Sequence, residues 1–259
     1  MRAASACRLA ALVLACAAAG ADAQQGGRGF TLQENGQSVP GLSNADPSAI
    51  VAAEIAFLQR AQERGQWTGF RETADKDAVM FVPEVVNAER WLRKKKDPPQ
   101  SVSWSPDRIF MACDGSYGVA EGHATWPDGR KGGYVTLWRR QAQGDYKWVL
   151  DWGVDKPKPG RADGDEETID GKVAECVPRS MGPQRQFARD SDERRRPQRV
   201  KYEVVRIADP PPANGEGQSR DGTLRWRWTT GPDGARTLKV DMREDRELRT
   251  VIDDSSSGH

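Results

Sequence analysis

SVSWSPDRIFMACDGSYGVAEGHATWPDGRKGGYVTLWRRQAQGDYKWVLDWG, residues Ser101 to Gly153, decides the fold. Gly, Asp and Pro gather at three points in this stretch, where they supply the tight or positive-φ conformations of hairpin turns. Between these points lie runs rich in β-branched and aromatic residues, which predict a meander of four antiparallel strands. The strands are Val102 to Ala112, Tyr117 to Trp126, Gly133 to Arg140 and Tyr146 to Trp152, and the turns are Asp114-Gly115, Pro127-Asp128-Gly129 and Gly144-Asp145.

A helix is predicted upstream of the meander. Asp46 is a good N-cap, and Pro47 suits the first helical position. Apolar residues then recur at helical spacing until Gly65, which is placed to end the helix. The stripe that this helix is expected to bury consists of Ile50, Glu54, Phe57, Leu58 and Ala61, widened by Val51 and Ile55.

Three shorter elements are predicted between that helix and the meander. Residues 67–75 indicate a second helix, and residues 79–82 indicate a short strand that Pro83 stops. Asn87 is placed to cap a third helix. The lysine run 94–96 at its end is interpreted as a solvated helix terminus, which the helix dipole favours.

The order helix, helix, strand, helix and long meander resembles the nuclear transport factor 2-like superfamily, in its SnoaL-like branch of unknown function. The stretches that carry the resemblance are EIAF (54–57), RGQWTGF (64–70), DAVMFVP (77–83) and YKWVLD (146–151). The resemblance covers residues 45–153 and implies an α+β fold, with N-terminal helices on a curved antiparallel sheet around a cone-shaped pocket. The fold leaves the function open, because the superfamily contains enzymes such as ketosteroid isomerase, transport factors and assembly modules.

Candidates for acid–base chemistry follow from the resemblance, which implies an Asp or a His inside the cone. Alternation places Glu121 and His123 on one face of their strand. If that face lines the cone, the two side chains could share proton transfer, and if it is the outer face they form an ordinary solvated pair. Asp151 would be either a base with a raised pKa in the pocket or a cap at the rim of the sheet.

Aromatic side chains provide candidate walls for a ligand site. Tyr134, Thr136 and Trp138 share one face of the third strand of the meander. Nine tryptophans in 259 residues is a high count, and core packing is the alternative interpretation for most of them. The candidate ligand-binding residues are Trp67, Phe70, Phe81, Trp91, Tyr134 and Trp138.

Several other site classes are not supported. A single internal histidine and scattered cysteines do not provide metal-ligand spacing, so we expect no metal and no cofactor. The Gly-rich stretch 26–29 does not follow a strand and is not a phosphate loop. No G-x-S-x-G elbow is present. A net charge of +1 gives no field that favours nucleic acid.

The first 23 residues are predicted to be a signal peptide. Arg2 and Arg8 form a positive n-region, Leu9 to Ala19 an apolar core too short to span a membrane, and Ala21-Asp22-Ala23 a cleavage signature. The protein is therefore expected in the periplasm or outside the cell, with a flexible segment over 24–44. The alternative is a lipoprotein anchored at Cys16.

The C-terminal part has a different composition. Residues 154–199 are rich in charge, Pro and Gly and are predicted to be a linker. Residues 200–259 are predicted to be a β-rich appendage, built on a hairpin that turns at 231–234. Because a lone hairpin is marginal in water, it must either join strands at 200–207 and 248–252 or dock on the main domain.

Cys113 and Cys176 remain after the predicted cleavage. Two cysteines in an oxidising compartment tend to pair, and this bond would pin the appendage to the edge of the main sheet. The alternative is a buried Cys113 that packs as a small hydrophobe, with Cys176 free.

The leading function that these observations predict is binding of a small apolar or amphipathic molecule, or of another protein. The alternative is a lyase or isomerase that works inside the cone with Glu121, His123 or Asp151. A third interpretation is an assembly module that forms a homodimer through the open face of the sheet.

Overall fold

The structure is a computed structural model, and it describes residues 45–82, 84–154, 168–177, 211–231 and 233–256. The predicted signal peptide, Cys16, the segment 24–44 and the strand predicted at 200–207 lie outside the described residues. In chain order the elements are α1 (Pro47–Arg64), α2 (Gln66–Thr73), β1 (Ala74–Phe81), β2 (Val85–Asn87), α3 (Ala88–Arg93), β3 (Ser103–Met111), β4 (Tyr117–Thr125), β5 (Lys131–Arg140), β6 (Tyr146–Val154), β7 (Asp170–Val173), β8 (Asn214–Gln218), β9 (Leu224–Thr230), β10 (Arg236–Glu244) and β11 (Glu247–Ser256).

The predicted helix signals are confirmed. Asp46 caps α1 by accepting a hydrogen bond from the Ser48 backbone N–H, and Gly65 ends the helix with a φ of 103°. Asn87 caps α3 in the same way, through the Arg90 backbone N–H. The second helix is shorter than predicted, because Ala74 begins β1 instead of continuing α2.

The meander β3–β6 forms as predicted, with its three turns in place. Gly115, Gly129 and Gly144 have φ values of 66°, 85° and 100°, which explains why glycine stands in each turn. The strand order of this sheet is β2-β1-β6-β5-β4-β3-β7, so the meander β3–β6 lies between β1 and β7.

The sheet is mixed, whereas the sequence predicted an antiparallel one. β1 pairs with β6 in parallel, and β7 pairs with β3 in parallel. β7 lies inside the stretch predicted to be a linker. Both parallel pairs join strands that are distant in the chain, so no turn signal in the local sequence predicts them.

A β-bulge in β6 changes which side chains share a face. The register with β5 shifts so that Leu137 pairs with Leu150 while Trp138 pairs with Trp148. Strict alternation along residues 146–152 would place Trp148 on the same face as Leu150 and Trp152, and the bulge breaks that alternation. Trp148 belongs to the core under the helices, and the other two side chains belong to the core on the opposite face.

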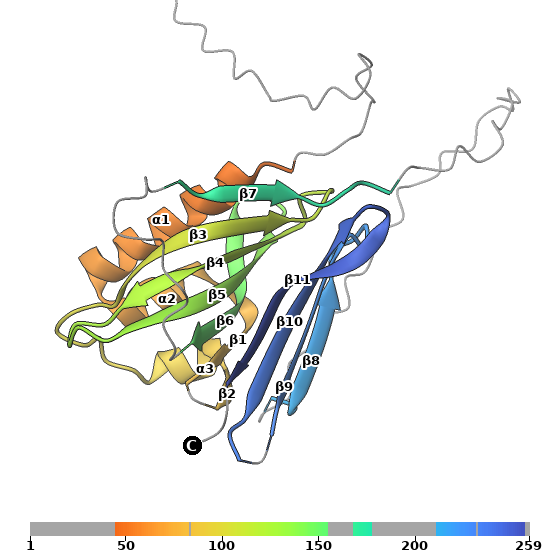
Figure 1. Ribbon diagram of the computed structural model, residues 1–259. Coiled ribbons are helices and arrows are strands. Elements are labelled where there is room, and N and C mark those ends of the chain that lie inside the picture. Colours follow the sequence, from red (N-terminus) through yellow and green to blue (C-terminus); the bar gives the residue numbers. More distant parts are fainter. Residues whose placement is uncertain (1–44, 83, 155–167, 178–210, 232, 257–259) are drawn as a thin grey trace, which may run out of the picture. The chain divides into compact units, whose positions relative to one another are not determined.

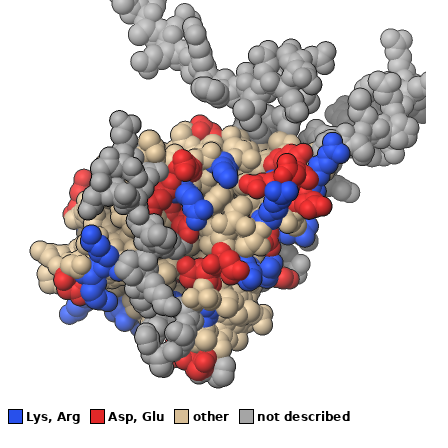
Figure 2. All heavy atoms as spheres, in the orientation of Figure 1, with Lys and Arg blue, Asp and Glu red and all other residues tan. Residues whose placement is uncertain are grey.

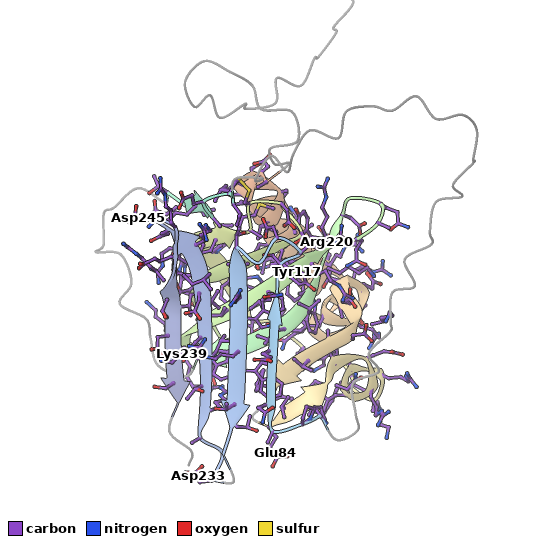
Figure 3. All side chains as sticks on the ribbon, turned by 90° about the vertical axis from the view of Figure 1, so that its right-hand side faces the viewer. Glu84, Tyr117, Arg220, Asp233, Lys239 and Asp245 are labelled. Atoms are coloured by element: carbon purple, nitrogen blue, oxygen red, sulfur yellow. A yellow bond between two sulfur atoms is a disulfide. The ribbon has the colours of Figure 1, made fainter. Side chains whose placement is uncertain are left out.

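The predicted hairpin is confirmed as β9–β10, and it lies in a separate four-stranded antiparallel sheet of order β11-β10-β9-β8, called the C-terminal sheet here. Figure 3 shows this sheet face on, with Asp233 and Asp245 at opposite ends and Lys239 between them. Acidic and basic side chains lie interspersed on the face of the molecule drawn in Figure 2.

Each face of the seven-stranded sheet is covered by different elements. The helices pack on one face, where α1, α2 and α3 contribute Phe57, Phe70 and Leu92 to a shared core. The C-terminal sheet packs on the other through a second core that includes Trp152 and Trp228 (Figure 1). It therefore covers much of the sheet face through which the homodimer was predicted.

The predicted disulfide between Cys113 and Cys176 is present, with a Cα–Cα distance of 5.2 Å. It joins the residues that follow β3 and β7, and it lies beside the C-terminal sheet. The Cys113 backbone N–H donates to Thr223 Oγ1 at 3.0 Å. Asp114 and Asp221 each accept a hydrogen bond from the other's backbone N–H, at 3.1 and 2.9 Å. The disulfide thus reinforces a polar junction between the two sheets.

Candidate functional site

A buried carboxylate, that of Glu54, lies in the middle of the apolar stripe of α1 and faces the seven-stranded sheet. Its side chain is closed off from solvent. Three donors hold it: Trp138 Nε1 at 2.7 Å from Oε1, and Trp104 Nε1 and Tyr134 OH at 3.0 and 3.3 Å from Oε2. Because an indole N–H can only donate, the two tryptophans fix the carboxylate as the acceptor.

Burial raises the pKa of Glu54 to about 7, since the charged form loses its hydration. The hydrogen bonds from Trp138, Trp104 and Tyr134 act in the opposite direction, because they stabilise the carboxylate. Negative charge on Asp151 raises the pKa further. Glu54 is therefore a neutral-pH titrating group inside the fold.

Asp151 is the second carboxyl group on this side of the sheet. It lies in β6, opposite Thr136 of β5 and beside Met80 of β1. Burial raises its pKa to about 7, while a hydrogen bond from Thr136 and the positive charge of Arg236 act to lower it. The residue Asp151 is half-buried, whereas Glu54 is buried. Asp151 is thus the more accessible residue of the pair.

Open space adjoins Asp151. Gly153, two residues further along β6, pairs with Tyr134, so a side chain at 153 would point to the helix-facing side. A Cβ built there meets no atom within 4 Å. Nearby on β5, Gly132 leaves room for the ring of Trp126, whose nearest atom would lie 2.8 Å from an added Cβ. In the register of β5 and β6, the neighbours of this position on the same face are Tyr134, Thr136 and Asp151.

The predicted ligand-binding aromatics fall into three places. Tyr134 and Trp138 hold Glu54, as described above. Phe70 packs in the closed core, with its ring centroid 4.6 Å from that of Phe57. Trp67 and Trp91 contact each other edge to face at 5.1 Å, at the junction of α2 and α3.

Phe81 lies on the opposite face of the sheet from these aromatics. It packs against Trp152 and Trp228, with ring centroids 4.6 and 5.2 Å away. Its role is in the core between the two sheets.

Glu121 and His123 also lie on the face opposite the helices, as in the second interpretation of that strand, but they do not form the solvated pair that it predicted. Glu121 is buried and forms an ion pair with Arg108. The His123 side chain is 52% exposed, and its Nδ1 lies 3.2 Å from Asp107 Oδ1. The structure brings neither of them to Asp151, so the three acid–base candidates do not form one site.

Sequence reasoning named Glu54 only as part of a helical stripe and did not single out Trp104. The available signal was the charge itself: a carboxyl group inside an otherwise apolar helix face must be satisfied by partners when it is buried. Among the described residues, no three His, Cys, Asp or Glu side chains are grouped to hold a metal ion, and no helix is long and apolar enough to cross a membrane.

The sequence itself matches no protein-family model and no curated protein. Solved structures are similar to part of the chain. A ketosteroid isomerase-like protein from Erwinia carotovora atroseptica is 14% identical over 43% of this chain and 96% of its own, with a TM-score of 0.33. A protein from Catenulispora acidiphila in complex with S-DNPA is 14% identical over 41% and 90%, with a TM-score of 0.32. A nuclear transport factor 2-like superfamily protein from Salmonella enterica serovar Typhimurium is 13% identical over 46% and 96%, with a TM-score of 0.33. Each of these solved structures matches less than half of this chain.

Proposed function

We propose that this protein binds a small amphipathic molecule on the helix-facing side of the seven-stranded sheet, with the polar group of the ligand against Asp151. The observation that carries the proposal is the open space at Gly153, beside the half-buried residue Asp151 on the same face of β6. Pockets of this kind are mostly apolar and use a few placed polar groups to orient their ligands.

The surrounding side chains define what such a ligand would offer. Tyr134 and Trp126 provide aromatic surface, and Thr136 and Asp151 provide hydrogen-bonding atoms. With a pKa of about 7, the Asp151 carboxyl donates a proton in a hydrogen bond below neutral pH and only accepts above it. A hydroxyl group fits both states, and an amine fits the ionised one.

The second candidate is acid–base catalysis, as an isomerase or lyase, with Asp151 as the base. The pKa of about 7 favours it, because a general base works best when its pKa is near the operating pH. Glu121 and His123 have no part in this version, since they lie on the other face of the sheet.

The test is a thermal-shift screen of aromatic and alicyclic alcohols and amines against the wild type, Asp151→Ala and Asp151→Asn. Compounds that stabilise the wild type should lose at least tenfold in affinity with Asp151→Ala. Asp233→Ala, in the β9–β10 turn, is the matched control and should bind as the wild type does. Equal binding by Asp151→Ala would contradict the proposal.

Turnover separates the two candidates. Each compound that binds is incubated with the wild type and analysed for isomerised or eliminated products. Products formed by the wild type and lost in Asp151→Asn, which keeps the shape but not the basicity, would establish the enzyme. Binding without products would favour the non-catalytic protein.

We also propose that the protein works outside the cytoplasm. The leader-like first 23 residues and the disulfide support this, because disulfides persist in oxidising compartments. Expression of the full chain with an intact export system, followed by N-terminal sequencing, should give a mature chain that begins near Gln24. A retained leader would contradict it, and a lipid-modified Cys16 would establish the lipoprotein.

A further inference from the structure

A buried arginine crosses from the C-terminal sheet to the end of β6. Arg236, the first residue of β10, is buried among aromatic rings. Its guanidinium carbon lies 4.9 Å from the ring centroid of Trp152 and 5.9 Å from that of Phe81. Its Nη2 donates to the Gly153 carbonyl oxygen at 2.7 Å.

These contacts bracket the part of β6 that carries the proposed site. Gly153 borders the open space, and Asp151 lies two residues before it on the same face. Trp152, between them, points to the opposite face and lies under the guanidinium group. Arg236 therefore contacts β6 through the Trp152 ring and the Gly153 carbonyl oxygen. Trp152 lies on the sheet face opposite the one on which the ligand is proposed to bind.

The charges around Asp151 give Arg236 a second role. The groups that act electrostatically with Asp151 are the carboxyl of Glu54 from α1, the phenol of Tyr134 from β5 and the guanidinium of Arg236 from β10. Neighbouring β1 contributes the apolar Met80. Among the described residues, Arg236 is the cation that lowers the pKa of Asp151, against burial, which raises it.

We propose that Arg236 is a positioning residue of the Asp151 site, which makes the C-terminal sheet a functional part of that site. It fixes the C-terminal end of β6 through Gly153 and supplies the positive charge that balances the Asp151 carboxylate from across the sheet. This role rests on the proposed function, since it matters only if Asp151 meets a ligand.

The chemistry of the contact requires arginine. A planar guanidinium group stacks on an indole and at the same time donates in its own plane to a carbonyl. A lysine keeps the charge but cannot do both. Lysine and methionine substitutions therefore separate the electrostatic role from the geometric one.

The experiment follows the Asp151 carboxyl carbon by NMR as a function of pH in the full-length protein, with no ligand. Arg236→Met should raise the Asp151 titration midpoint by about one pH unit, because the balancing charge is gone. Arg236→Lys should keep the midpoint but shift the Gly153 carbonyl resonance. The control is Arg227→Met, which removes an arginine of β9 paired with Asp241 at 2.7 Å, and which should leave both unchanged.

A midpoint in folded Arg236→Met equal to that of the wild type would overturn the proposal. If that variant does not fold, an unchanged Gly153 resonance in Arg236→Lys would overturn it instead. The readout needs no ligand, so it is distinct from the binding screen. A shifted midpoint in a protein that binds no compound would contradict the proposed function and leave the link between Arg236 and Asp151 established.

Discussion

The two faces of the seven-stranded sheet bury different chemistry. On the helix-facing side, Glu54 lies inside the core under two indoles and a phenol, and Asp151 lies at an open space. On the other side, the C-terminal sheet closes over an apolar cluster around Trp152. That side also buries charged groups, but Glu121 is paired with Arg108 and Arg236 lies against two aromatic rings. The helix-facing side instead keeps two carboxyl groups in place at a cost in stability, which is typical of functional sites.

The largest expected effect compares one tryptophan from each face. Trp138→Ala and Trp152→Ala should each destabilise the protein by about 3–5 kcal/mol, the range for large aromatic truncations. Trp138→Ala should cost about 1–3 kcal/mol more, because it also removes a donor from the buried Glu54 carboxylate. Urea denaturation measures both. Equal losses would show that the Trp138–Glu54 hydrogen bond contributes no more than the contacts of the Trp152 indole with Asp254 and Arg236.

Removal of the disulfide tests how strongly the packing between the seven-stranded sheet and the C-terminal sheet depends on a covalent bond. Its sequence separation is 63 residues, so the double variant Cys113→Ala with Cys176→Ala should lose about 4 kcal/mol in the chain-entropy view. Denaturation midpoints of the oxidised wild type and of this variant give the difference. A loss below about 1 kcal/mol would mean that the polar junction at Asp114 and Asp221 holds the sheets together without it.

The pH dependence of stability tests the helix-facing side. The Glu54 pKa is about 7 in the folded protein against 4.5 as the ordinary value. Between these values the folded state holds a proton that the unfolded state has released, so stability is full below pH 4.5 and is lost as pH rises through 7. The loss is about 3 kcal/mol from Glu54.

Glu54→Gln should therefore make the fall in unfolding free energy between pH 5 and pH 8 less steep, and the fall that remains is expected from Asp151, whose pKa is also raised to about 7. The amide nitrogen faces donors and cannot accept from them, so the variant should be less stable than the wild type at low pH, where Glu54 is protonated. The slope, and not the level, is the measurement. A slope equal to that of the wild type would show that Glu54 keeps its charge throughout this range.

The smallest effect is expected at His123, on the exposed part of the other face. His123→Ala removes only a surface contact with Asp107, and such pairs contribute about 0–1 kcal/mol. The unfolding free energy should change by less than about 0.5 kcal/mol. Ligand affinity should stay at the wild-type value, and a tenfold loss would return His123 to the site.

Local signals allowed much of the fold to be predicted. Asp46, Asn87 and the turn glycines act within a few residues of themselves, so their roles are readable in sequence. β8 shows the limit: Gly215 and Gly217 carry no strand signal, yet they pair with Trp228 and Trp226. An added Cβ at either would lie 2.6 or 2.3 Å from the indole, so glycine is required there by a distant partner.

The candidate site was predicted only in part, for the same reason. Asp151 was identified as an end-of-strand carboxyl group. The bulge that puts Trp148 on the same face of β6 as Asp151 has no local sequence signal. Glu54 depends on Trp104 and Trp138, which are 50 and 84 residues away in the chain. A buried charge is visible in sequence, whereas the donors that satisfy it are set by the tertiary fold.

The C-terminal sheet has a consequence for how the protein behaves on dilution. A cover supplied by a second molecule would dissociate at low concentration and expose the apolar face, because association follows mass action. Here the cover is carried by the same chain, and the disulfide ties Cys176, which precedes the C-terminal sheet in the chain, to Cys113. Its effective concentration is therefore fixed by covalent connection, and the face around Trp152 stays covered even when the protein is scarce.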